Sequence, residues 1–129
     1  MTTEDLQSSS TGGTAGGIDV QAGGGDVQTG DQTVNAGTGD ANINVGASGD
    51  ISTGNQTATT NDGNASINNV AGGNINLRDQ IATATGGNAS INNQAGGNIT
   101  VAGDQTAVAD GGNASINNVA GGNITAGDQ

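Results

Sequence analysis

The chain has 129 residues, of which 26 are glycine, and it has no aromatic residue, proline, histidine or cysteine. Its formal net charge is −11, with a single basic residue, Arg78. This composition excludes a wide aromatic core, disulfide bonds, the usual zinc and haem sites, and catalysis by cysteine or a Ser-His-Asp triad. It also excludes the basic surface that nucleic-acid binding needs. We therefore expect no enzyme activity, no cofactor and no nucleic-acid partner.

Residues 1–7 are predicted to form a polar N-terminal tail. They lack the basic and apolar regions of a secretory signal peptide. No apolar run in the chain approaches the ~18 residues of a transmembrane helix, so we expect no membrane insertion. Residues 8–129 are predicted to form a single repeat domain.

Three sequence markers recur through that domain at spacings of 24 or 25 residues. A composition rich in glycine and asparagine is also typical of disordered segments, but a disordered segment has no reason to hold a register. A period of this length is typical of stacked repeats instead. The markers are Gln at 7, 32, 56, 80, 105 and 129; Ile at 18, 43, 67, 91 and 116; and Val27 followed by Ile at 51, 75, 99 and 124.

Each repeat alternates apolar and polar residues, which is typical of a strand with one buried face. The alternation predicts a first strand over residues 40–45, a glycine-rich corner over 46–49 and a second strand over 50–53. A corner over 54–56, a third strand over 57–60 and a corner over 61–63 complete the repeat. The expected fold is an all-β β-solenoid with about 24 residues per coil, about five coils and three short strands per coil. A two-faced coil remains an alternative, and either handedness is possible.

The twelve residues "NASINNVAGGNI" stand at 64–75 and 113–124, and with one substitution at 88–99. Stacked coils place equivalent residues directly above one another. Isoleucines then form an apolar core stack, and asparagines form a ladder in which each amide donates and accepts. The predicted stack is Ile43, Ile67, Ile91, Ile116, Ile51, Ile75, Ile99 and Ile124; the predicted ladder is Asn64, Asn88, Asn113, Asn74, Asn98 and Asn123.

One column of corner residues keeps its charge in the later coils, at Asp79, Asp104 and Asp128. Carboxylates on a glycine-rich corner are possible Ca²⁺ ligands, although a solvated corner is the favoured interpretation. The threonine positions, such as Thr59 and Thr83, suggest a flat ice-binding face as another alternative. The Asn-x-Ser/Thr triplets follow from the repeat itself and indicate no modification.

The stretch "GGNASINNVAGGNI", with glutamine at a fixed phase, resembles the repeats of curli-type functional-amyloid subunits. The resemblance covers most of the chain from Gly63 onward. It implies an extracellular or cell-surface β-solenoid fibre. The same stacking also resembles the solenoids of bacterial and phage fibres.

Gln7 and Gln129 stand at the same phase of the repeat, five periods apart. The last residues, "GGNITAGDQ", show no capping segment, and the N-terminal tail is expected to be too short and polar to cap the other end. Uncapped solenoid ends expose strand edges, and a head-to-tail contact that does not close generates filaments. We therefore predict a structural protein whose partner is itself. The alternatives are an uncapped segment of a larger phage or bacterial fibre or adhesin, and an ice- or calcium-binding solenoid.

Overall fold

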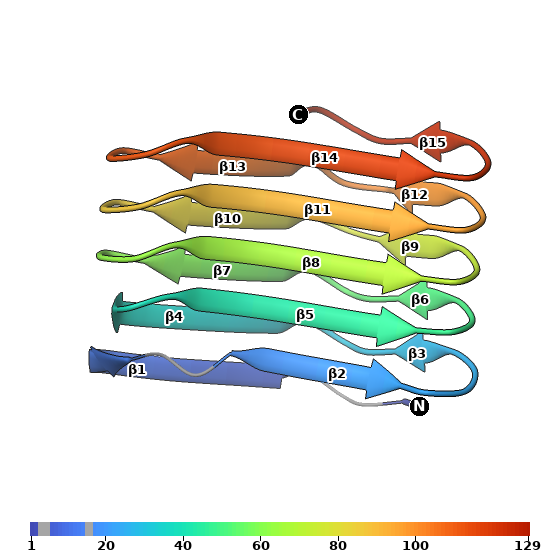
Figure 1. Cartoon of the computed structure of the whole chain (residues 1–129), viewed down its shortest axis with the longest axis horizontal. Helices are drawn as coiled ribbons and strands as arrows, with labels where there is room; N and C mark the ends of the chain where they lie inside the picture. Colours follow the sequence, from blue (N-terminus) through green and yellow to red (C-terminus); the bar gives the residue numbers. More distant parts are fainter. Residues whose placement is uncertain (3–5, 15–16) are drawn as a thin grey trace.

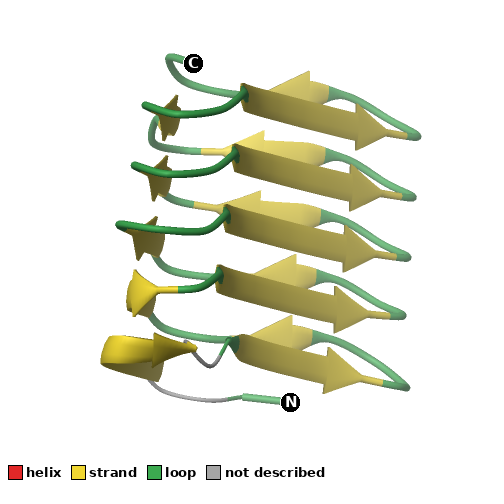
Figure 2. Cartoon of the chain, turned by 60° about the vertical axis from the view of Figure 1, so that its left-hand side comes forward, coloured by secondary structure: helices red, strands yellow, loops and turns green. Residues whose placement is uncertain are grey.

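A computed structural model describes residues 1–2, 6–14 and 17–129. These residues form 15 β-strands arranged in three parallel sheets of five strands each (Figure 1). The chain visits the three sheets in turn, so each coil adds one strand to each sheet (Figure 2). The described part of the chain has no helix that could cross a membrane. The prediction of an all-β solenoid with three short strands per coil is confirmed.

The strands of each sheet differ in length but keep the same order along the stack. The first sheet contains β1 (Leu6–Thr14), β4 (Gln32–Thr38), β7 (Gln56–Thr60), β10 (Gln80–Ala84) and β13 (Gln105–Ala109). The second contains β2 (Ile18–Ala22), β5 (Ala41–Ala47), β8 (Ala65–Ala71), β11 (Ala89–Ala95) and β14 (Ala114–Ala120). The third contains β3 (Val27–Gln28), β6 (Ile51–Ser52), β9 (Ile75–Leu77), β12 (Ile99–Val101) and β15 (Ile124–Thr125).

The strand register follows the sequence repeat. Ile67 of β8 pairs with Ile43 below it and with Ile91 above it, and Ile91 pairs with Ile116. Gln32, Gln56, Gln80 and Gln105 pair in the same way along the first sheet. Equivalent residues therefore lie directly above one another over four complete turns.

The spacings of 25 residues come from single insertions at corners. The corner between β2 and β3 is one residue longer than its counterpart between β5 and β6, and it contains Gly25 with φ of 98°. The corner between β12 and β13 is one residue longer than that between β9 and β10 and includes Ala102. Because the extra residues lie outside the strands, the sheets stay in register.

The core is a narrow column that runs through the centre of the stack. Along β8, Ala65, Ile67, Asn69 and Ala71 are buried, while the residues between them are exposed or half-buried. Small residues such as Ala65 and Ala71 alternate with isoleucine in this core. Their small volume allows the three sheets to pack closely around it. The largest fully buried apolar side chains are Ile43, Ile51, Ile67, Ile75, Ile91 and Ile99.

Two details differ from the sequence-based expectation. Gln56, predicted in a corner, is the first residue of β7 and is fully buried. In the first coil, Leu6 and not Gln7 pairs with Gln32, while Gln7 pairs with Thr33. The glutamine column of the described structure therefore begins at Gln32, and the apolar Leu6 lies one coil below Gln32.

Candidate assembly interface

A column of glutamine side chains runs inside the stack at the start of the first-sheet strands. Gln32, Gln56 and Gln80 are 0% exposed, and Gln105 is 1% exposed. From Gln56 onward, Nε2 donates to Oε1 of the glutamine one coil nearer the N-terminus, over 2.6 Å from Gln56 to Gln32, 2.8 Å from Gln80 to Gln56 and 2.7 Å from Gln105 to Gln80. Gln129 continues the column, with its Nε2 3.4 Å from Gln105 Oε1.

A second internal column, of asparagines, stands beside the glutamines. It consists of Asn69, Asn93 and Asn118, in β8, β11 and β14. Here Nδ2 donates toward the C-terminal end, from Asn69 to Asn93 Oδ1 and from Asn93 to Asn118 Oδ1, each over 2.8 Å. The two columns are also joined within the coils that contain both residues: Gln56 Nε2 donates to Asn69 Oδ1 and Asn69 Nδ2 donates to Gln56 Oε1, both over 2.9 Å.

This double ladder keeps buried amides supplied with partners from coil to coil, as buried polar groups require. Sequence reasoning used the glutamines only as markers of the period and missed their place in the core. It also missed Asn69 and its equivalents. The signal was present, because Asn69 follows Ile67 by two residues and therefore lies on the same face of the strand.

A different set of columns occupies the corners. There Oδ1 of an Asp or Asn accepts the backbone N–H of the equivalent residue one coil above, as between Asp50 and Asn74 over 2.6 Å and between Asn74 and Asn98 over 2.9 Å. Since either residue type offers this acceptor, Asp and Asn exchange freely along the columns. The three columns are 26, 50, 74, 98, 123; 31, 55, 79, 104, 128; and 40, 64, 88, 113.

The six asparagines of the predicted ladder all lie in these corner columns. In their main coil-to-coil bond a backbone N–H donates to a side-chain oxygen, whereas the prediction was of amide-to-amide bonds. Amide donors add to it in two places, from Asn64 Nδ2 to Asp40 Oδ1 over 3.1 Å and from Asn74 Nδ2 to Asp50 Oδ1 over 3.3 Å. The outer face of the second sheet carries an amide-to-amide series instead, from Asn117 to Asn92 to Asn68.

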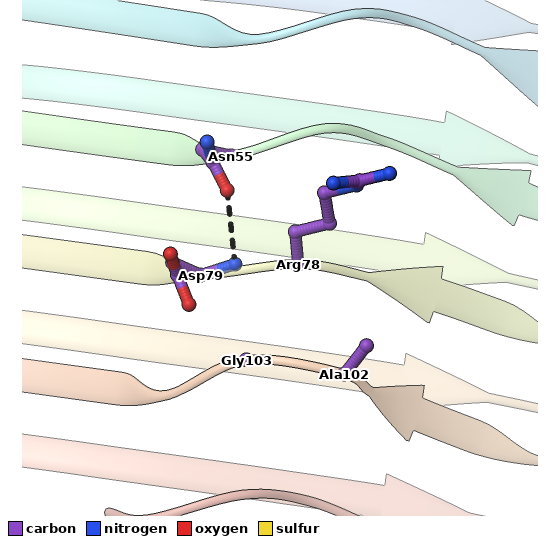
Figure 3. Close-up of a pocket in the computed structure, with 5 residues that line it drawn as sticks. All are labelled: Asn55, Arg78, Asp79, Ala102 and Gly103. Carbon is purple, nitrogen blue, oxygen red and sulfur yellow. Dashed lines mark hydrogen bonds between the residues drawn. The ribbon is translucent and has the colours of Figure 1, made fainter.

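The recurrent glycine before each corner Asp or Asn has a steric reason. A Cβ at Gly97 would lie 2.5 Å from Asn74 Oδ1, in the coil below. Arg78 replaces the glycine in one coil, and its side chain lies along the corner between Asn55 and the inserted Ala102 (Figure 3). The resulting pocket is lined by Asn55, Arg78, Asp79, Ala102 and Gly103.

The aspartates suggested as Ca²⁺ ligands and the threonines suggested as an ice-binding face lie on the surface in different parts of the coil. Asp79, Asp104 and Asp128 are exposed members of one corner column. Among the described residues, no group of three or more His, Cys, Asp or Glu side chains could hold a metal ion. Thr59 and Thr83 pair across β7 and β10, but Asn35 and Val108 occupy the next places in their row.

The coil formed by β13, β14 and β15 has one face without a partner strand in this structure. Ile116 is half-buried and Ile124 is 47% exposed, whereas Ile67 and Ile75 at the same phases are 0% exposed. The upper edges of β14 and β15 are therefore apolar at the centre and offer backbone groups along their length, which is the form of edge that recruits another strand.

The fold and the ladders define a β-solenoid repeat protein. No protein-family model matches the chain, and neither a curated protein nor a solved structure matches it.

Proposed function

We propose that this is a structural protein that stacks head-to-tail on copies of itself to form β-solenoid filaments. The observation that supports this most directly is the contact between successive coils. β8 and β11 differ only at Val70 and Gln94, and they pair residue for residue over their whole length. A coil of this protein is thus already complementary to a copy of itself, and two chains can make the contact that two coils make within one chain.

The open face of the last coil supplies the second argument. It presents the end of the isoleucine stack and the end of the Gln–Asn ladder, and a second copy would bury both. The stacking of a terminal coil on the first coil of the next chain is heterologous. Because it repeats the translation from coil to coil along the stack, it does not close into a ring and can extend indefinitely. The curli-like repeat supports an extracellular or cell-surface location for such a fibre. In a larger fibre or adhesin, the same contact would be made within one longer chain.

Electron microscopy of the concentrated protein tests the proposal. We expect unbranched filaments in which each subunit adds five coils, or roughly 24 Å of rise at the usual strand spacing. A Pro-containing extension after Gln129 should shorten them, because proline cannot donate to a strand ladder. A Gly/Ser extension of equal length is the matched control. Discrete particles of the size of one chain under all conditions would contradict the proposal.

A further inference from the structure

Met1 and Thr2, here called the N-terminal strand, lie beneath the third sheet and are joined to it by an isolated bridge. Thr2 pairs in parallel with Gln28 of β3. Gln28 N–H donates to the carbonyl of Met1 over 2.8 Å, and the Met1 ammonium donates to the carbonyl of Asp26 over 2.6 Å. The lower edge of β3 is therefore occupied, although it lies at the end of the stack opposite to the C-terminus (Figure 1).

The phase of this strand is that of β15. Gln28 pairs with Ser52, and the same row continues through Asn76 and Thr100 to Thr125. Thr2 thus stands one coil below Gln28 in the row that ends at Thr125. If a second copy stacks with its β14 beneath β2, its β15 must lie beneath β3, where Met1 and Thr2 lie.

The same conflict arises at the foot of the glutamine column. Leu6 lies beneath Gln32 and its N–H donates to the carbonyl of Asp31 over 2.8 Å. In a stacked pair, Gln129 of the lower copy would reach this place, because Gln129 lies one coil above Gln105. Met1, Thr2 and Leu6 of one chain and residues 124–129 of the next therefore compete for one position.

Gln32 indicates which of the two segments completes the structure. Its side chain is 0% exposed, and its Nε2 has no hydrogen-bond partner among the residues that the structure describes. Every later glutamine of the column donates from Nε2 to the glutamine below it. Leu6 cannot accept such a bond, whereas Oε1 of the neighbour's Gln129 could accept it and extend the column across the junction.

The N-terminal strand and the 124–129 segment also differ in their exposure and in the hydrogen bonds that hold them. Met1 is 53% exposed at the phase where Ile124 stands in the last coil. The 124–129 segment is held to its own chain by bonds from Gln105 N–H to the Asp128 carbonyl over 2.9 Å and from Asp128 N–H to Asp104 Oδ1 over 3.2 Å. The exchange therefore replaces the exposed Met1 with Ile124 and supplies the missing acceptor of a buried amide.

We propose that the N-terminal strand is a displaceable latch: it covers the lower edge of β3 in the free chain and must leave before the β15 segment of a second copy can dock. This inference rests on the proposed head-to-tail function. It makes exchange of the two segments the slow step of assembly, and it identifies Gln32 and Gln129 as the pair that closes the junction.

A disulfide lock tests the latch, since the chain has no cysteine of its own. Thr2→Cys with Gln28→Cys joins directly paired, exposed positions, and neighbouring strands lie within disulfide range. We expect the oxidised protein to form filaments at least about tenfold more slowly than the same protein after reduction. The matched control is Gln28→Cys with Ser52→Cys, which links β3 to β6 and leaves the N-terminal strand free. Its growth should not depend on reduction.

Two further variants separate the latch from the proposed function. Deletion of residues 2–6 should remove the lag before filament growth. In that background, Gln129→Leu should raise the lowest concentration at which filaments form by about fivefold, the equivalent of one hydrogen bond of about 1 kcal/mol. Filaments that grow equally fast with the oxidised lock would overturn the latch and leave head-to-tail assembly standing. The absence of filaments from the wild-type, reduced and deleted proteins alike would overturn both.

Discussion

Gln80 and Asn93 form a reciprocal amide pair across the core. Asn93 Nδ2 donates to Gln80 Oε1 over 2.8 Å, and Gln80 Nε2 donates to Asn93 Oδ1 over 3.2 Å. The asparagine follows the glutamine by 13 residues, and the same pair recurs in the coils on either side. In the coil of Gln32 this place is taken by Val45, which pairs with Asn69 in the second sheet. The ladder therefore loses one of its two columns there.

Val45→Asn should extend the missing column and stabilise the protein. The new Oδ1 would accept from Gln32 Nε2, and the new Nδ2 would reach Gln32 Oε1 and Asn69 Oδ1. A buried amide without a partner is destabilising by about 1–3 kcal/mol, so we expect a gain of about 1 kcal/mol after the loss of apolar burial. Thermal unfolding followed by circular dichroism measures the change.

Val34→Asn is the matched control for that substitution. Val34 is also fully buried, but the residue above it in its column is Ala58. Ala58 offers an amide there no side-chain hydrogen bond, so the variant should lose about 1–3 kcal/mol of stability. Equal effects at the two positions would mean that the ladder does not decide where an amide is tolerated.

Ile91→Asp should prevent folding. Ile91 is 1% exposed and lies between Ile67 and Ile116, so the substitution buries an unpaired charge in the apolar stack. Gln94→Asp, on the exposed side of the same strand, adds the same charge and should leave the circular dichroism spectrum and the unfolding temperature nearly unchanged. A folded Ile91→Asp protein would show that the stack tolerates a charge.

Gly97→Ala should be destabilising for a steric reason alone. The added Cβ would press on Asn74 Oδ1, and overpacking of this kind costs about 1–3 kcal/mol. Gly24→Ala has no atom within 4 Å of the added Cβ, so it should be neutral or slightly stabilising. Urea unfolding of both variants measures the difference, and a loss of stability at Gly24 that matches the loss at Gly97 would count against the steric explanation.

Asp104→Asn should preserve the corner and remove one charge from its column. The asparagine keeps the Oδ1 that accepts Asp128 N–H, while the repulsion from Asp79 and Asp128 falls. We expect a slightly higher unfolding temperature and a weaker dependence on NaCl concentration than in the wild type. Asp104→Ala removes the acceptor as well and should be less stable than Asp104→Asn. Both variants lack the charge, so the reverse order would show that the side-chain acceptor does not stabilise the corner.

Filament growth should depend on ionic conditions, because each subunit adds a charge of −11. Added salt or Ca²⁺ screens the repulsion between subunits, and acidification toward the isoelectric point near 4.1 lowers the charge itself. All three should speed growth, which light scattering can follow. Rates that are the same under all these conditions would show that the charges do not oppose stacking.

The fold could be predicted because equivalent residues recur in the sequence at the spacing of one coil. The recurrence of Ile67 at Ile91 and Ile116 fixes which residues stack, and the alternation around Ile67 fixes which face is buried. What could not be predicted depends on geometry that the period does not contain. The position of Gln56 at the entrance to β7, and the hydrogen bonds that it makes with Asn69, require the two sheets to be placed against each other.

The corners illustrate the same limit. The columns of Asp and Asn are visible in the sequence, and stacked carboxylates such as Asp79 and Asp104 should repel. The structure shows an acceptor function common to both residue types, which the charge argument had not included. At the N-terminus the sequence marker pointed to Gln7, but the strand pairs one residue earlier, at Leu6. Leu6 is apolar and packs against the core, and the buried face of a strand sets its register.

The opposite directions of the two internal columns have an electrostatic consequence. Glutamine amides that all donate toward the N-terminus align their dipoles, as peptide units do along a helix, where each unit contributes about 3.5 D. Asparagine amides that donate toward the C-terminus align in the other sense. In each coil that contains both residues the two contributions largely cancel. A stack of many subunits can therefore lengthen its amide ladder without accumulating a growing potential between its two ends.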